Sequence, residues 1–260
     1  MDWKKESEMF DRAAEYYDTF RPSYPSEIVD KIISATNITS NSKLLEIGAG
    51  SGKATTLFVP YNYEILCVDP GENLVKNGRI KFSEYNKIKF EVARFEELNL
   101  LPKYYDVVFS AQSFHWIPQP IGYEKCSYIL KDNGHLALFW NMYITYDNEL
   151  DQELIELSNK YGGFADFLTK NGCEERIESI KTGIENSGHF NTPLIHRVLW
   201  NQRYTADEYF GFALTGNHFV QKSELEKSKA YDDIGKLAFK HGGIINRPYL
   251  CVLYIASKSN

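Results

Sequence analysis

Short apolar runs and amphipathic stretches alternate along the middle of the chain. The apolar runs have the length and composition of buried strands, and the stretches between them show the helical spacing of apolar residues. The pattern predicts strands at 43–47, 64–68, 88–93, 105–110 and 135–141. It also predicts one helix that follows the first strand and ends at about 59, and further helices at about 71–83 and about 120–131. Strands that alternate with helices indicate an α/β fold with a doubly wound, mostly parallel sheet.

The two ends of the chain differ from this core. Residues 6–20 and 26–36 have the spacing of amphipathic helices, and the prolines of the sequence RPSYP separate them. After residue 142 the sequence is mostly helical and charged, with two runs of strand character. We expect one compact domain: N-terminal helices and core (1–142), helical lid insertions (143–189 and 205–242), and last strands that complete a seven-stranded sheet (190–204 and 243–260).

Composition narrows the possible partners. The 260 residues include 29 basic and 35 acidic side chains, a net charge of −6, and basic runs are short. Because nucleic-acid binding normally requires a basic footprint, we expect no nucleic-acid partner. The four cysteines are scattered without metal-ligand spacing, so no metal site is expected. We find no apolar leader or membrane-spanning run, and we therefore expect a cytoplasmic protein, monomeric or homodimeric.

A glycine-rich turn follows the first predicted strand, in the sequence LLEIGAGSG at 44–52. Gly48 and Gly50 fit the dinucleotide fingerprint, but Lys53 occupies its third glycine position. The phosphate-binding P-loop requires a longer spacing between glycines than Gly48 and Gly52 have. Glycine permits positive φ and close approach of a ligand to the backbone, so the turn indicates a nucleotide-type site.

Asp69 and Pro70 end the second predicted strand. An acidic residue at this place can accept hydrogen bonds from both ribose hydroxyls of a bound nucleoside. The alternative is that Asp69 caps the helix predicted at 71–83.

With Glu46 before the glycines, the turn reads E-x-G-x-G-x-G and resembles the first motif of class I S-adenosylmethionine (SAM)-dependent methyltransferases, of the type 11/25 kind. Phe95-Glu96 follows the third strand, and AQSFHW follows the fourth at 111–116. The sequence YDTFRPSYP at 17–25 resembles the N-terminal segment of the trans-aconitate methyltransferase-like subfamily. The likeness covers about residues 10–142 and implies a Rossmann-like methyltransferase fold.

The resemblance implies roles for individual residues. Phe95 would stack on adenine and Glu96 would contact the edge of the ring, although Arg94 stands where many members have Asp. Ala111 and Gln112 would border the methionine part of SAM, and Arg21 would pair with its carboxylate. The full set expected at the cofactor is Tyr17, Arg21, Glu46, Gly48, Ala49, Gly50, Asp69, Pro70, Phe95, Glu96, Ala111 and Gln112.

The pocket for the molecule that accepts the methyl group is expected to be lined mainly by aromatic residues. His115 is the candidate base, because imidazole titrates near neutral pH, and the alternative is that it only lines the pocket. Tyr24, Trp116, Trp140 and Tyr143 are the other expected pocket residues. We predict methyl transfer from SAM, giving S-adenosylhomocysteine (SAH), to a small molecule; a carboxylate acceptor follows from the resemblance. The alternatives are a nicotinamide-dependent oxidoreductase, supported by Gly48, Gly50 and Asp69, and a non-catalytic SAM-binding protein.

Overall fold

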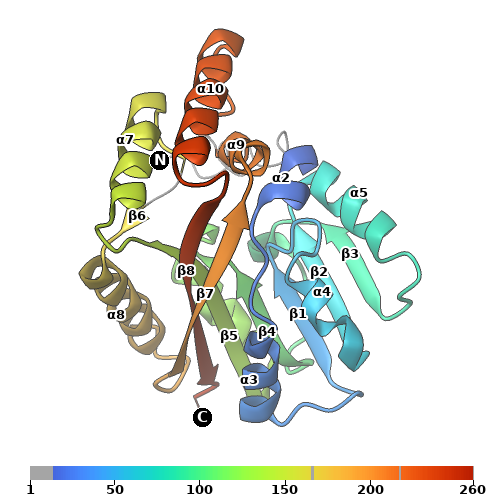
Figure 1. The fold of residues 1–260 in the computed structure, drawn as a ribbon. Helices are drawn as coiled ribbons and strands as arrows, with labels where there is room; N and C mark the ends of the chain where they lie inside the picture. Colours follow the sequence, from blue (N-terminus) through green and yellow to red (C-terminus); the bar gives the residue numbers. More distant parts are fainter. Residues whose placement is uncertain (1–13, 165–166, 217, 260) are drawn as a thin grey trace.

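The structure, a computed structural model, describes residues 14–164, 167–216 and 218–259. A single sheet of eight strands, in the order β3-β2-β1-β4-β5-β8-β7, runs through the molecule, and the short β6 pairs with β5 (Figure 1). Pairing is parallel except where β8 lies between β5 and β7. The strands are β1 Lys43–Ile47, β2 Glu64–Asp69, β3 Ile88–Val92, β4 Tyr105–Ala111, β5 Leu130–Ile144, β6 Phe167–Leu168, β7 Leu194–Tyr204 and β8 Ile245–Ser257. The predicted mostly parallel, doubly wound sheet is confirmed, and β6 is an addition to it.

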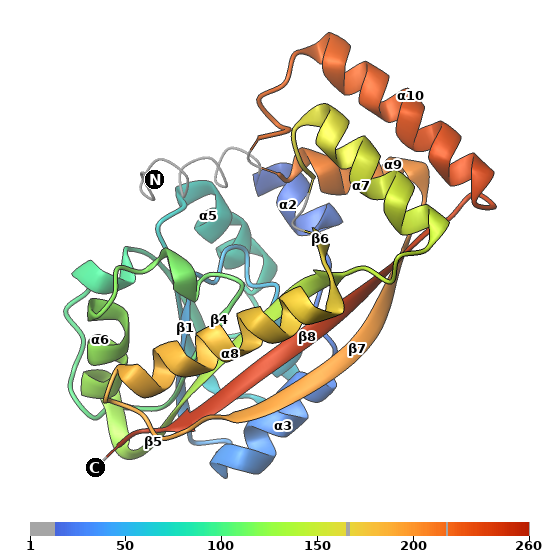
Figure 2. The same ribbon diagram turned by 90° about the vertical axis from the view of Figure 1, so that its left-hand side faces the viewer.

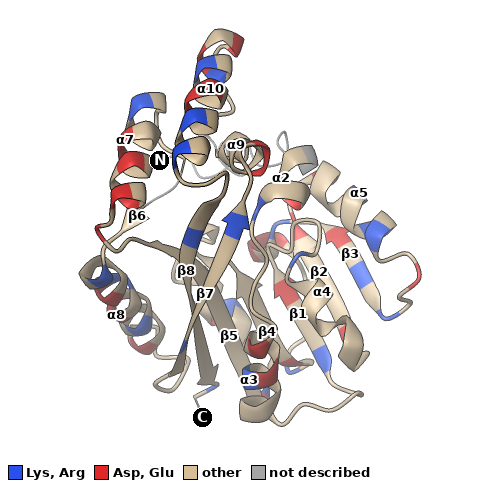
Figure 3. Ribbon diagram, viewed as in Figure 1, with Lys and Arg blue, Asp and Glu red and all other residues tan. Residues whose placement is uncertain are grey.

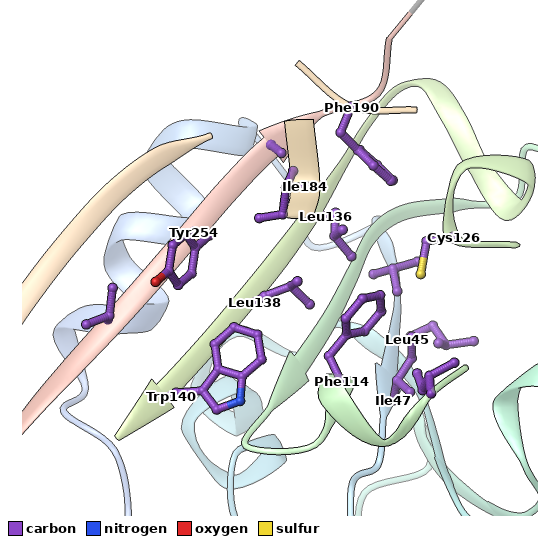
Figure 4. Close-up of a cluster of buried hydrophobic side chains, with 14 of the residues drawn as sticks. Leu45, Ile47, Phe114, Cys126, Leu136, Leu138, Trp140, Ile184, Phe190 and Tyr254 are labelled. Carbon is purple, nitrogen blue, oxygen red and sulfur yellow. The ribbon is translucent and has the colours of Figure 1, made fainter. Parts of the chain in front are cut away.

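Helices cover both faces of the sheet. Strand residues alternate between the faces, so Leu44 of β1 packs with α3, α4 and α5 while Leu45 packs with α6 and α8. Figure 4 shows the second of these clusters, in which Leu136 of β5 lies beside Ile184 of α8 and Leu138 lies next to Trp140. The helices are α3 Glu27–Thr36, α4 Thr55–Phe58, α5 Glu72–Lys81, α6 Ile121–Ile129 and α8 Lys170–Asn186.

A third cluster of helices stands at one end of the long strands β5, β7 and β8 (Figure 2). It consists of α7 Glu149–Tyr161, α9 Ala206–Leu214 and α10 Glu224–Lys240, and α2 Ala14–Phe20 packs on α9. We call α7, α9 and α10 the lid. The α8 helix lies within the segment 143–189 that we expected to form the lid, but it covers the sheet because Cys173, Ile177 and Ile184 face the core.

Ser26, Thr205 and Ser223 each stand directly before a helix, and two of them cap it. Thr205 and Ser223 both form capping boxes, with Glu208 and Glu226. Ser26 makes no capping bond, because its backbone is already helical. The helix expected after the glycine turn is only one turn long, α4, followed by the 3₁₀ helix Val59–Tyr61.

Candidate functional site

One cavity of about 530 Å³ opens at the carboxyl ends of β1, β2, β4 and β5, below the lid. It has a glycine-turn half, lined by residues between 46 and 96, and an aromatic half, lined by residues from 111 onward. The side chain of Tyr17 lies outside the described part of the chain. All other predicted site residues line the cavity: Arg21, Tyr24, Glu46, Gly48, Ala49, Gly50, Asp69, Pro70, Phe95, Glu96, Ala111, Gln112, His115, Trp116, Trp140 and Tyr143.

The glycine turn is held against the loop after β4. Gly48, Gly50 and Gly52 all have positive φ, between 56° and 83°. A Cβ on Gly48 would lie 2.3 Å from Oγ of Ser113, which itself donates a hydrogen bond of 2.8 Å to the carbonyl of Ile47. Glycine at position 48 is therefore required both for the backbone conformation and for the space.

Glu46 lies at the base of the turn and is buried. Thr55 Oγ1 donates a hydrogen bond of 2.5 Å to its carboxyl group. Burial raises the pKa of Glu46 to about 8, and the bond from Thr55 opposes that rise only in part. The cavity floor is therefore largely uncharged at neutral pH at this position.

Asp69 is fixed by two backbone donors. Its Oδ2 accepts from the Gly50 amide at 2.9 Å, and its Oδ1 accepts from the Gly71 amide at 2.8 Å. The α5 helix begins directly after Gly71, so the Asp69 carboxylate also lies at the N-terminal end of that helix, and its role as a helix cap stays an alternative. Each carboxylate oxygen can accept more than one hydrogen bond, and the group can therefore also accept from hydroxyls in the cavity.

The turn after β3 forms the far end of the glycine-turn half. Phe95 is buried in the 3₁₀ helix Phe95–Glu97, with Lys125 Nζ 5.4 Å from its ring centroid. Oε1 of Glu96 is buried and accepts no hydrogen bond from the described residues. A buried carboxylate oxygen is costly without a donor, so this position calls for a donor from a bound molecule.

Side chains from β4 and β5 organise the aromatic half. Gln112 has φ of 60°, and its Oε1 accepts from the Asn141 amide at 2.6 Å. Trp140 Nε1 donates to His115 Nδ1 at 3.4 Å, and the rings of His115 and Trp116 are 4.8 Å apart. A neutral His115 that accepts at Nδ1 carries its proton on Nε2.

Residues 18–21 connect the glycine turn to the lid. Lys53 Nζ donates to the carbonyls of Asp18 and Arg21, at 2.7 and 2.8 Å, and Ser51 Oγ donates to the Asp18 carboxylate at 2.9 Å. The Arg21 guanidinium donates to Tyr143 Oη at 2.9 Å and to the Thr215 carbonyl at 3.1 Å. Its expected pairing with a cofactor carboxylate stays a prediction.

Several cavity residues from the later part of the chain carry no local signal that would predict them from the sequence. They are Gly162, Gly163, Phe164, Leu168, Arg176, Gly216 and His218. Helical periodicity identifies the buried face of a helix, but it does not tell which helix end or loop covers a cavity elsewhere in the fold.

Comparison with known proteins supports a methyltransferase. Residues 45–138 match the family model described as "Methyltransferase domain". An uncharacterized methyltransferase of Mycobacterium tuberculosis is 24% identical over 248 residues, which are 95% of this chain and 92% of that protein. Saccharomyces cerevisiae "Probable S-adenosylmethionine-dependent methyltransferase CRG1" is 33% identical over 159 residues, 60% of this chain and 54% of that protein.

Solved structures share the fold. Phosphoethanolamine N-methyltransferase 2 of Haemonchus contortus, solved with SAH and phosphomonomethylethanolamine, aligns with a TM-score of 0.54 at 14% identity, covering 96% of this chain and 58% of that one. The alignment shows that this chain and that methyltransferase have the same fold. Within the described chain, no helix has the length and apolar character needed to span a membrane.

Proposed function

We propose that this protein transfers the methyl group of SAM to a small-molecule acceptor, and that the atom methylated is a carboxylate oxygen. The observation that carries the proposal is the convergence of the glycine turn, Asp69, Glu96 and the loop of His115 on one cavity. The carboxylate rests on the likeness of residues 17–25 and 111–116 to trans-aconitate methyltransferase-like proteins.

The glycine-turn half suits the nucleoside part of SAM. Asp69, fixed by the Gly50 and Gly71 amides, would accept hydrogen bonds from the ribose hydroxyls. The Phe95 ring would cover the adenine, and Glu96 Oε1 would accept from its amino group, which supplies the missing donor. The Haemonchus neighbour, solved with SAH, lends support to this choice of cofactor.

The methionine part of SAM would lie where the glycine-turn half of the cavity meets the aromatic half. Ala111 and Gln112 would flank the methionine chain, and Arg21 would lie toward its carboxylate. Tyr17 belongs to the proposed cofactor site by the resemblance alone. Glu46, largely protonated at neutral pH, would lie beneath this part of the cofactor. These roles are proposals from the family resemblance and from the place of each residue in the cavity wall.

The chain's own task is to orient the acceptor and to exclude water. SAM, when bound, supplies a methyl group on a positively charged sulfur; as the oxygen–methyl bond forms, the carbon–sulfur electron pair returns to sulfur and SAH results. A carboxylate acceptor is already deprotonated, so no base is needed. This agrees with His115, whose Nδ1 lone pair is turned toward Trp140, and we assign His115 to the pocket wall.

Replacement of Asp69 tests the proposal. We expect Asp69→Ala to weaken SAH binding roughly 100-fold, because two charge-assisted hydrogen bonds to the ribose are lost. Asp69→Asn should weaken it less, since one acceptor oxygen is retained. Isothermal titration calorimetry with SAH and with NAD measures both, and circular dichroism checks the fold.

The control is Asp30→Ala, because Asp30 is exposed and bonds to Tyr61 outside the cavity. It should bind SAH like the wild type. Wild-type protein that binds NAD and not SAH would contradict the proposal in favour of an oxidoreductase. SAH binding without turnover of methyl-labelled SAM across a broad metabolite panel would point to a non-catalytic SAM-binding protein.

A further inference from the structure

Tyr143 has an unusual position in the aromatic half of the cavity. It lies near the end of β5, is 9% exposed and lines the cavity. Its phenol oxygen accepts a hydrogen bond of 2.9 Å from Arg21 Nη1. The hydroxyl proton must therefore point elsewhere, and it meets no acceptor among the described residues. A buried donor without an acceptor calls for an acceptor atom in the cavity.

The surroundings hold both side chains in place. The Tyr143 ring packs against Tyr249 and Phe212, with centroid distances of 5.0 and 5.7 Å. Arg21 is held by the Thr215 carbonyl at 3.1 Å and lies 5.5 Å from the Phe212 ring centroid. The donor is therefore pre-organised, so little conformational freedom is lost when a ligand binds to it.

The charge distribution around Tyr143 favours an anion. The acidic side chains that line the cavity, Glu46, Asp69 and Glu96, belong to the glycine-turn half. Among the described residues that line the aromatic half, none is Asp or Glu, and Arg176 adds a second guanidinium. Figure 3 shows that α8, which carries Arg176, has residues of both signs along its length, so the helix as a whole is not basic.

We propose that Tyr143 selects the acceptor by donating its hydroxyl hydrogen bond to an anionic oxygen, of a carboxylate or a phosphate, and that Arg21 is the positioning residue that orients this donor. The inference rests on the proposed methyl transfer and adds the group that recognises the acceptor. Aromatic rings such as Trp116 and Trp140 could attract an ammonium ion, but the Arg21 charge beside the phenol disfavours it.

Binding of matched small molecules to the SAH complex tests the inference. The probes are benzoate, phenyl phosphate, benzamide and benzylamine, and a second set with a four-carbon chain: succinate, succinamide and 1,4-diaminobutane. We expect the wild-type complex to bind anionic members of a set more tightly than the amide or amine. Benzoate compared with phenyl phosphate tells whether a carboxylate or a phosphate is the preferred group.

Tyr143→Phe should weaken binding of the anionic probes roughly 10- to 100-fold and leave SAH affinity unchanged, because one charge-assisted hydrogen bond is lost. At saturating SAH, Arg21→Gln should weaken the anionic probes by a similar factor, although it should also lower SAH affinity because Arg21 is proposed to lie toward the cofactor carboxylate. For the anionic probes, the double variant should be no worse than either single one, since Arg21 acts through Tyr143. The control is Tyr249→Phe, which removes a buried hydroxyl bonded to Tyr204, outside the cavity lining. It should keep the anion preference.

Each possible outcome of these binding experiments has a distinct meaning. Wild-type protein that fails to bind SAH would contradict the proposed methyl transfer itself. An intact SAH complex with no preference for the anionic probes of either set would overturn the role of Tyr143, as would a Tyr143→Phe variant that keeps that preference. Equal losses in Tyr249→Phe would indicate a general packing effect and would overturn it as well.

Discussion

Single residues in the glycine turn have two separate constraints, one on the backbone and one on space. Gly48 and Gly50 both have positive φ, 65° and 56°. A Cβ on Gly50 would meet nothing within 4 Å, whereas a Cβ on Gly48 would lie 2.3 Å from Ser113 Oγ and 2.4 Å from Ser113 Cβ. The two positions therefore separate the cost of backbone strain from the cost of a steric clash.

We expect Gly48→Ala to lower the free energy of unfolding by about 2–4 kcal/mol, of which about 1–2 kcal/mol comes from the positive φ and the rest from overpacking against Ser113. Gly50→Ala should cost only the first part. Urea denaturation measures both. Gly235→Ala, in α10 with nothing within 4 Å of the added Cβ, is the control and should be neutral or stabilising. Equal losses at positions 48 and 50 would contradict the clash with Ser113.

Sequence signals at the residue scale located the glycine-turn half better than the aromatic half. Gly48 and Asp69 carry local signals, because the turn and the end of the strand need their particular chemistry. The partners of Arg21, which are Tyr143 and Thr215, are far away in the sequence, and no local pattern specifies them. Arg176 and His218 were missed for the same reason.

At the scale of elements, strand positions were predicted best. The boundaries of β1 agree with the predicted 43–47, and β7 lies within the predicted segment 190–204, because each strand is a single run between turn residues. β5 begins earlier than predicted, at Leu130, and its pairing with β4 is irregular between Leu130 and His135. Residues Asp132-Asn133-Gly134, which lie between the predicted helix and the predicted strand, fall in this irregular part and belong to β5 in the structure.

A buried ion pair contributes to the attachment of the lid to the sheet. Arg247 of β8 donates to Asp151 of α7 at 2.7 Å, and both side chains are almost fully buried. Asp151 also accepts from the Tyr146 amide at 2.6 Å, and Arg247 stacks on Phe167 at 4.9 Å. The pair therefore joins β8, α7 and β6 within the interior.

Removing one partner of this pair should leave an uncompensated buried charge. We expect Arg247→Met to lower the free energy of unfolding by about 3–5 kcal/mol, measured by urea denaturation. The control is Arg197→Met, which breaks the exposed pair of Arg197 with Glu174 and should cost less than about 1 kcal/mol. A loss at Arg247 as small as that at Arg197 would show that solvent reaches the Asp151 carboxylate.

For the whole molecule, the question is whether the lid folds with the core or separately. β5, β7 and β8 run continuously from the sheet into the lid, and the lid cluster includes Tyr143, Tyr204 and Tyr249 from these strands. Arg21 adds a further connection, since its segment is held by the glycine turn while its side chain is held by Thr215 after α9. No linker separates two hydrophobic cores in the described chain.

We therefore expect a single cooperative unfolding transition, although chains of this length commonly unfold in steps. Far-UV circular dichroism reports on all helices, and the fluorescence of Trp116, Trp140 and Trp200 reports on the cavity and on β7. Their midpoints in urea should coincide, and hydrogen exchange in α10 should require the same opening free energy as in β1, within about 1 kcal/mol. If the amides of α7 and α10 lose their protection from hydrogen exchange at lower urea than those of β1 and β4, the lid is a separate folding unit. It could then open over the cavity while the sheet stays intact.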